Sequence, residues 1–170
     1  MAEKLYYEPH EILAVTIEKG IIKAGNPLYK QLILSFMAGA FIAFASEGSN
    51  MAAFGFLIKP ELYGLGKFVA GLIFPVGLIL VLLAGGELFT GNNLITAAYM
   101  EKKVSLFSML KNWLTVYAGN FAGSIFIAYL IVKSGQLSHG AHLLGGVTIK
   151  IAHSKISLTF VQAVFLNLKR

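Results

Sequence analysis

The stretch Gly85-Gly86-Glu87-Leu88-Phe89-Thr90-Gly91-Asn92-Asn93-Leu94 places polar side chains and flexible backbone inside a long apolar segment. Residues 68–83 before it carry no charge, and residues 94–100 after it are again mostly apolar. Backbone polar groups have no water partners in hydrocarbon, so such a break is stable at membrane depth only against other protein or beside a wet cavity. The stretch therefore predicts a pathway through a membrane. Composition alone supports equally a short extramembrane turn between two helices.

The residue types in the break indicate which kind of solute it favours. Its glycines loosen the backbone, while Thr90, Asn92 and Asn93 are types that cap helix starts, so a second half-helix is expected to begin near Asn92. The amides at such a start carry a partial positive charge and favour anions. Broken helices of this kind form the binding sites of many transporters.

Composition indicates a membrane protein. The chain of 170 residues is 56% hydrophobic and 13% charged, with a mean hydropathy of +0.72. It has no cysteine, which excludes disulfides and a thiol nucleophile. The net charge of +6 comes without a basic run interleaved with aromatics, so a nucleic-acid partner is not expected. The N-terminus has no early apolar run, which argues against a cleaved signal peptide.

We expect an all-α membrane protein forming a single transmembrane domain over residues 1–170. Its N-terminal part, residues 1–27, is expected to be an amphipathic helix at the cytoplasmic membrane surface. The expected spans are residues 28–45, 65–100 with a break at 85–93, 113–132 and 156–168. Irregular connections are expected over residues 46–60, with a possible short helix at 51–58, and over residues 99–111 and 134–154. The last span has 13 residues and is incomplete, because a crossing needs roughly 17–25.

Lysine and arginine counts predict the orientation. Nine of them lie on the side of the N-terminus and five on the other side, which places the N-terminus in the cytoplasm. Within the third span, Gly119 and Gly123 are spaced four apart, a pattern that allows two helices to approach closely. We interpret these glycines as packing residues and Asn120 between them as a donor of interhelical hydrogen bonds. Pro75 is expected to kink the second span.

Three motifs carry a family resemblance: Gly-Leu-Ile-Leu at 77–80, Glu-Leu-Phe-Thr at 87–90 and Lys-Asn-Trp-Leu-Thr-Val-Tyr-Ala-Gly-Asn at 111–120. Together they resemble the formate/nitrite transporter family and its hydrosulfide-channel branch, over about residues 23–166. The resemblance implies an aquaporin-like helical bundle of six spans in two inverted halves, of which four are present here. It also implies a homopentamer, without cofactor or metal, whose protomers each conduct formate, nitrite or hydrosulfide, or the conjugate acid, across the cytoplasmic (inner) membrane.

The resemblance also implies roles for individual residues. Phe74 and Leu78 would line the second-span side of the pore, with Phe74 toward the outer constriction. Leu88 and Phe89 would form the inner constriction. The break itself would supply the mobile hydroxyl of Thr90, together with Gly91 and Asn92. Lys155 would match the basic residue that draws anions to the outer mouth, and Lys23 matches a lysine near the start of the first span.

Other ionisable residues favour structural interpretations. Glu87 is the one carboxylate expected near membrane depth, and we expect it to accept hydrogen bonds from a helix terminus or a neighbouring side chain, although a proton-coupled role stays open. Lys155 has the alternative of an interfacial lysine that extends to water. His139, His142 and His153 fall in or beside one hydrophilic connection and do not suggest a metal site.

The chain departs from the family pattern in its second half. The second broken helix and the pore histidine of the fifth span are not found, so transport is expected of a complete protein rather than of residues 1–170 alone. The leading function is therefore an anion channel. The alternative is a non-conducting membrane scaffold or fragment that assembles partners through Gly119 and Gly123. An enzyme is not expected, because no Ser/His pair, metal cluster or carboxylate pair falls at membrane depth.

Overall fold

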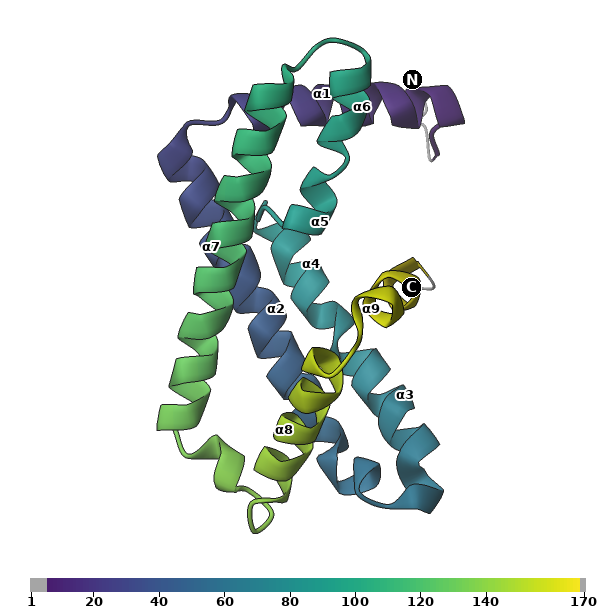
Figure 1. The fold of residues 1–170 in the computed structure, drawn as a ribbon, viewed down its shortest axis with the longest axis vertical. Helices are drawn as coiled ribbons and strands as arrows, with labels where there is room; N and C mark the ends of the chain where they lie inside the picture. The colour runs from purple at the N-terminus through teal and green to yellow at the C-terminus, as the bar shows by residue number, and fades with distance from the viewer. Residues whose placement is uncertain (1–5, 169–170) are drawn as a thin grey trace. The chain divides into compact units, whose positions relative to one another are not determined.

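The structure, a computed structural model, describes residues 6–168, and every regular element among them is a helix. The described residues fall into two compact units. The first unit comprises the described parts of Met1–Phe44 and Val76–Ala128, and the second unit those of Ala45–Pro75 and Tyr129–Arg170. Figure 1 shows the helices with their labels. The expectation of an all-α protein is confirmed.

In the first unit, helix α1 (Pro9–Gly25) packs along helix α6 (Ile95–Met100), as Figure 1 shows. Its first turn contains Pro9, whose fixed φ suits that position, and the Glu11 carboxylate accepts a hydrogen bond from the Glu8 amide at 2.7 Å. Gly20 allows the close approach to α6, because an added Cβ would lie 3.1 Å from the Ala98 Cβ. The N-terminal helix is thus fixed to the helix that follows the break.

Helices α2 (Leu28–Leu57) and α7 (Leu106–Lys133) pack through small residues within the first unit. A Cβ added at Gly119 would overlap the Ser35 hydroxyl, and one at Gly123 would overlap the carbonyl oxygen of Phe36. On the opposing helix, a Cβ at Gly39 would overlap the backbone of Asn120. The two backbones therefore approach closely only because these positions are glycines. The expected packing role of Gly119 and Gly123 is confirmed.

The interrupted segment consists of short helices. It runs through the 3₁₀ helix η1 (Pro60–Leu62), α3 (Tyr63–Ile73), α4 (Pro75–Leu83), α5 (Phe89–Asn92) and α6. Helix α4 ends at Leu83, and Gly85 follows with a φ of +65°, a left-handed conformation that glycine adopts without strain. The Gly86 amide then donates to the carbonyl of Val81 at 2.8 Å, which closes the helix end.

Two connections expected to be irregular are largely helical. Residues 46–57 continue α2, because their run of alanine, methionine and phenylalanine contains no strong breaker before Pro60. Residues 134–154 contain the 3₁₀ helix η2 (Gln136–Ser138) and most of α8 (Leu143–Ile156). Likewise α7 begins at Leu106, so the expected loop over 99–111 is shorter.

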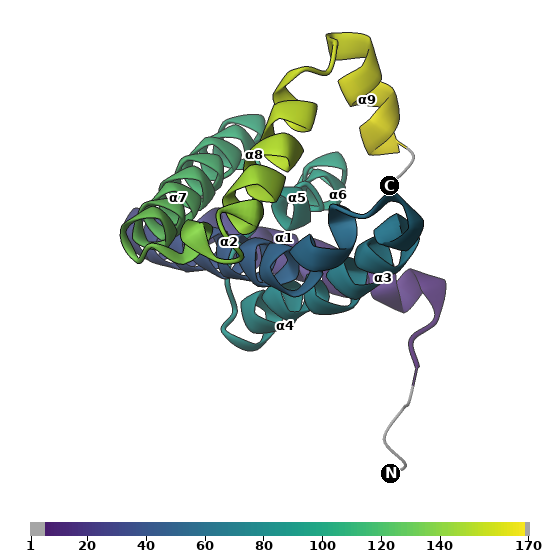
Figure 2. The same cartoon turned by 90° about the horizontal axis from the view of Figure 1, so that it is seen from below.

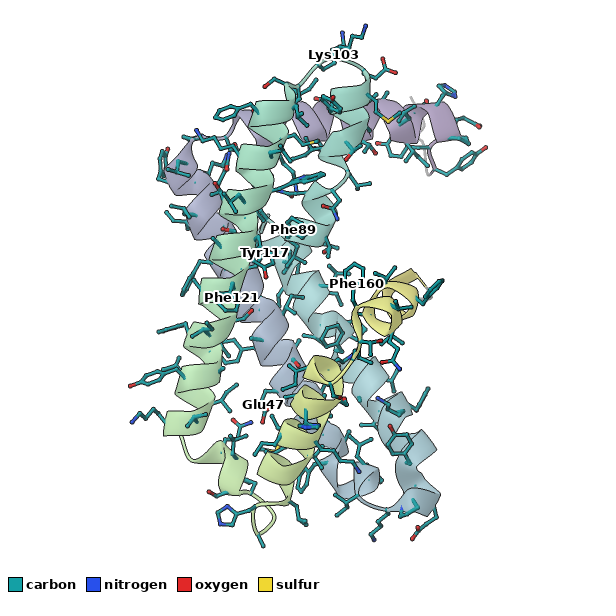
Figure 3. The ribbon with its side chains drawn as sticks, viewed as in Figure 1. Glu47, Phe89, Lys103, Tyr117, Phe121 and Phe160 are labelled. Carbon is teal, nitrogen blue, oxygen red and sulfur yellow. The ribbon has the colours of Figure 1, made fainter. Side chains whose placement is uncertain are left out.

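The second unit is held together around a buried carboxylate. Glu47 on α2, labelled in Figure 3, is 6% exposed. Its oxygens accept hydrogen bonds from Asn50 at 3.2 Å, from Thr148 of α8 at 3.5 Å and from Gln136 of η2 at 3.5 Å. Helix α8 is followed by α9 (Phe160–Leu168) after a bend of 106°, visible in Figures 1 and 2.

Three helical segments of the described residues are long and apolar enough to cross a bilayer: Leu28–Leu57, Pro60–Leu83 and Leu106–Lys133. The bent pair of α8 and α9 satisfies the same length and composition criteria when its two helices are taken together. Most of the large apolar side chains in these segments are exposed, as expected for helices whose neighbours include lipid.

We expect Gly123→Ala to lower the free energy of unfolding by about 1–3 kcal/mol, because its Cβ would meet the backbone of α2 rather than a movable side chain. Denaturant unfolding in detergent micelles measures this change. Gly55→Ala, on α2 with open space around its added Cβ, is the matched control and should be neutral or stabilising by up to about 1 kcal/mol. Equal stability of the two variants would contradict the packing role.

Candidate functional site

A buried carboxylate lies at the centre of the break. Glu87 is 2% exposed, and its carboxylate oxygens accept hydrogen bonds from the side-chain amides of Asn26 at 2.9 Å and Asn92 at 2.8 Å. Its own amide donates to the carbonyl of Leu34 on α2 at 3.2 Å. A buried carboxylate needs such donors, because desolvation otherwise disfavours its charged form. The expectation that Glu87 accepts from neighbouring side chains is confirmed.

Asn92 is completely buried and connects Glu87 to the rest of the site. Its Nδ2 donates both to Glu87 and to Asn112 Oδ1, the latter at 2.8 Å. Its Oδ1 accepts from the Lys23 ammonium of α1 at 2.7 Å, and its backbone carbonyl accepts from Trp113 Nε1 at 2.9 Å. Nearly all the hydrogen-bonding capacity of this side chain is used, so it links α1, the break and α7.

A second asparagine on α7 satisfies the backbone of the break. The Asn120 Nδ2 donates to the carbonyls of Ser35 and Glu87, both at 2.8 Å, while its Oδ1 accepts from the Phe89 amide at 2.9 Å. The interhelical hydrogen bonds expected of Asn120 are confirmed. The expected helix start near Asn92 is wrong, because α5 begins at Phe89 and the side chain of Asn120 on α7 caps it in place of a local Thr or Asn.

Aromatic contacts fix Phe89. Its ring lies 5.6 Å from the ring of Tyr117 and 6.1 Å from that of Trp113, both in edge-to-face arrangements. Figure 3 shows Phe89 and Tyr117 close together between α5 and α7. Such pairs contribute beyond simple burial. The side chain predicted at the inner constriction is therefore held against α7.

The opposite side of α5 is accessible. Leu88 is half-buried, while Thr90 and Gly91 are exposed. Among the described residues, none accepts a hydrogen bond from the Thr90 hydroxyl or from the amides of Thr90 and Gly91. This face therefore presents one hydroxyl and two amide donors without protein partners.

Two hollows lie beside the break within the first unit. The larger, of about 430 Å³, is bordered by Gly85, Glu87 and the lysines at 19, 23 and 30. The other, of about 280 Å³, is bordered by Gly91 and again by the lysines at 19 and 23. Lys23 thus borders both hollows and contacts Asn92 between them. Positive charge next to free amide donors favours an anionic solute.

Burial lowers the pKa of the Lys23 ammonium below its ordinary value of 10.5, and the nearby Glu87 carboxylate opposes that shift. The contact between these two charges runs through the Asn92 amide, which binds the ammonium with its oxygen and the carboxylate with its nitrogen. The arrangement neutralises a buried negative charge next to the break.

The first unit brings together a subset of the residues singled out from the sequence, namely Lys23 and residues 87–92. Leu78 lies exposed on α4 of the same unit. Phe74, which follows the last residue of α3, and Lys155, near the end of α8, are both exposed and belong to the second unit. No group of His, Asp or Glu residues within the described part of the chain forms a possible metal site.

Sequence reasoning missed the contributions of Asn26, Asn112 and Trp113. A signal was available for α7, because Asn112 and Asn120 are eight residues apart and so share one helix face in an otherwise apolar segment. For Asn26 the sequence offered no comparable signal. Its hydrogen bond with Glu87 depends on a contact between residues 61 positions apart.

The fold and the site define a polytopic all-helical membrane protein with a helix interrupted beside a buried polar network. Comparison with known families gives the same class: the formate/nitrite transporter profile matches residues 10–167. The chain therefore belongs to the formate/nitrite transporter family, as the motifs at 77–80, 87–90 and 111–120 had indicated.

Individual relatives support this assignment. The chain is 39% identical to the formate channel BtFdhC of Bacillus thuringiensis over 163 residues, covering 95% of this chain and 61% of the relative. It is 32% identical to the formate channel FocA of Escherichia coli K12, covering 94% of this chain and 55% of the relative. A solved pentameric formate channel with formate bound matches with a TM-score of 0.71 and 35% identity, over 79% of this chain and 52% of that one. The chain thus spans a little over half the length of these relatives.

We expect Asn92→Ala to lower the free energy of unfolding by about 2–4 kcal/mol, because it removes the acceptor of the Lys23 ammonium, one of the two donors to the Glu87 carboxylate and the donor to Asn112 Oδ1. The neighbouring Asn93→Ala is the control. Asn93 is exposed and its side chain makes no hydrogen bond with a described residue, so its removal should change stability by less than about 0.5 kcal/mol. Denaturant unfolding in micelles compares the two, and similar losses would contradict the network.

The lowered pKa of Lys23 predicts a pH dependence. Between that lowered pKa and 10.5 the unfolded chain holds the Lys23 proton and the folded chain has released it, so the free energy of unfolding should rise with pH in this window. Lys23→Met should lose this part of the rise, measured by unfolding at a series of pH values. Lys103→Met, on an exposed turn between α6 and α7 (Figure 3), is the control for loss of one positive charge. A Lys23→Met profile parallel to that of the unchanged chain would refute the assignment.

Proposed function

We propose that the protein is a channel for small monovalent anions, with formate as the best supported solute, across the cytoplasmic membrane with its N-terminus in the cytoplasm. The observation that carries the proposal is the exposed face of α5 next to the lysine-lined hollows, where the Thr90 hydroxyl and the amides of Thr90 and Gly91 have no partner within residues 6–168. The similarity to proteins described as formate channels supports formate. Nitrite and hydrosulfide share its charge and small size, so the same site suits them.

The pathway would combine a narrow apolar constriction with a few hydrogen-bond donors. Leu88 would form the inner constriction with Phe89, which is held in place by the aromatic contacts with α7. Phe74 and Leu78 would line the second-span side of the pore, with Phe74 toward the outer constriction. Walls of this kind exclude a hydrated ion but admit a small solute that sheds water or takes up a proton. Thr90 and Gly91 would then replace the lost water molecules with hydrogen bonds.

The charges around the break would determine whether the pathway favours anions or cations. Glu87 would repel an anion if it were open to the pathway, but it is buried and bound by two asparagine amides. Lys23 offsets its charge and, with the lysines at 19 and 30, makes the adjoining hollow positive. We propose that Lys155 supplies a corresponding positive charge at the outer mouth. This arrangement favours anions over cations.

We propose that the whole protein acts as a homo-oligomer of five protomers. The solved relative is a pentameric formate channel, which supports that number.

The alternative of a non-conducting scaffold is disfavoured by the packing. Gly119 and Gly123, the residues on which that alternative depended, contact α2 of the same chain and leave no room for a partner helix. A proton-coupled carrier centred on Glu87 is disfavoured by the burial of this side chain, which is 2% exposed and bound by two asparagine amides.

We expect Thr90→Val to lower formate flux into liposomes by about tenfold or more, because a hydrogen bond to a charged group contributes about 1.5–3 kcal/mol. Leu88→Trp should lower flux by obstruction. Thr115→Val, the same chemical change within α7 and away from the break, is the control and should retain flux. Fluorescent pH or isotope uptake measures each variant, and unchanged flux in Thr90→Val would argue strongly against the proposed pathway.

A further inference from the structure

The second unit contains a basic groove that shares only one residue with the proposed pathway, namely Lys155. It has a volume of about 210 Å³ and lies between α3 and α8. Its positive side chains are Lys67 of α3 and Lys150 and Lys155 of α8. The remaining lining residues are Leu57, Tyr63, Val147, Ile151 and Ser154. We call this set the lysine groove.

The charges of the lysine groove are not balanced by the protein. The described residues of the second unit include five lysines but only two glutamates, at 47 and 61, and neither lines the groove. Glu47 is buried and bound by neutral side chains. Among the residues that the structure describes, none forms an ion pair with a groove lysine. Like charges gathered in one groove repel, so a bound anion would relieve that repulsion.

One groove lysine is held in place without losing its donors. The Lys67 ammonium lies 5.9 Å from the centre of the Tyr63 ring, a cation–π contact within α3. Among the described residues, none accepts a hydrogen bond from the Lys67 ammonium, which can therefore donate to a ligand. All three lysines and Tyr63 are exposed, so a ligand can reach them from outside. Ser154 adds a hydroxyl to the same rim.

The walls of the groove show which anion it fits. Leu57, Val147 and Ile151 add apolar surface to the lining that carries the ammonium groups. A small inorganic ion would gain nothing from that surface, whereas a phospholipid carries a phosphate next to acyl chains. Lysine is a common point-charge partner of phosphate, and basic pockets beside membrane helices bind anionic headgroups.

We propose that the lysine groove binds an anionic phospholipid, with its phosphate between Lys67, Lys150 and Lys155 and the start of an acyl chain against Leu57 and Ile151. The proposal goes beyond transport, because lipid occupancy does not depend on whether the break conducts anions. The experiment that tests it therefore measures bound lipid rather than anion flux.

The test uses the purified chain in detergent, titrated with phosphatidylglycerol, phosphatidylcholine or inorganic phosphate, and native mass spectrometry counts the bound molecules. We expect selective retention of phosphatidylglycerol. Lys67→Gln with Lys150→Gln should weaken its binding by about 25-fold, at about fivefold for each lysine near a membrane surface. The charge-preserving pair Lys67→Arg and Lys150→Arg should retain it, which separates loss of charge from loss of fold.

The matched control is Lys133→Gln. Lys133 lies in the same unit and makes a similar cation–π contact, 5.7 Å from the Tyr129 ring, but does not line the groove. It should bind phosphatidylglycerol like the unchanged chain. Equal loss in Lys133→Gln, equal retention of phosphatidylcholine, or displacement of the lipid by millimolar inorganic phosphate would each overturn the proposal.

Discussion

The structure depends on one constraint: backbone polar groups at the break between α4 and α5 must find partners inside the protein, because a lipid environment offers none. The side chain of Asn120 satisfies most of these backbone groups. One side chain accepts from the Phe89 amide and donates to the Glu87 carbonyl, while the Glu87 amide reaches Leu34 on α2. With those groups satisfied, the donors of Thr90 and Gly91, which have no partner among the described residues, are left on the exposed side of α5.

The buried charge at Glu87 adds a second requirement. Neutral amides from Asn26 and Asn92 stabilise the carboxylate, and Asn92 extends the connection to Lys23 on α1. A direct ion pair would demand that both charges be desolvated at one point, which is costly. With Asn92 between them, the ammonium stays at the edge of the hollows while still offsetting the carboxylate. The N-terminal helix is thereby tied to the break by chemistry as well as by its packing on α6.

The sequence was sufficient for features that local patterns determine. Hydropathy predicted the helical membrane class, the glycine spacing at 119 and 123 predicted close packing, and the polar insertion predicted the break. The sequence was insufficient for features that depend on contacts between residues far apart in the chain. The start of α5 was misplaced because its cap comes from Asn120, 31 residues away, rather than from a neighbouring Thr or Asn. Helix α8 was missed because its glycines and polar residues resemble a loop, whereas Thr148 is anchored by Glu47 from α2.

At this site the hydrogen bonds of the break depend on the close packing of α2 and α7. An asparagine side chain is short, so Asn120 can bond both Ser35 on α2 and the break only if the helices are unusually close. Gly119 and Gly123 on either side of it, and Gly39 opposite, remove the side chains that would keep those backbones apart. A larger residue at any of these positions would move the amide away from Glu87 and Phe89. The glycines therefore control the position of the Asn120 side chain, and through it the cap of α5, without contacting the break themselves.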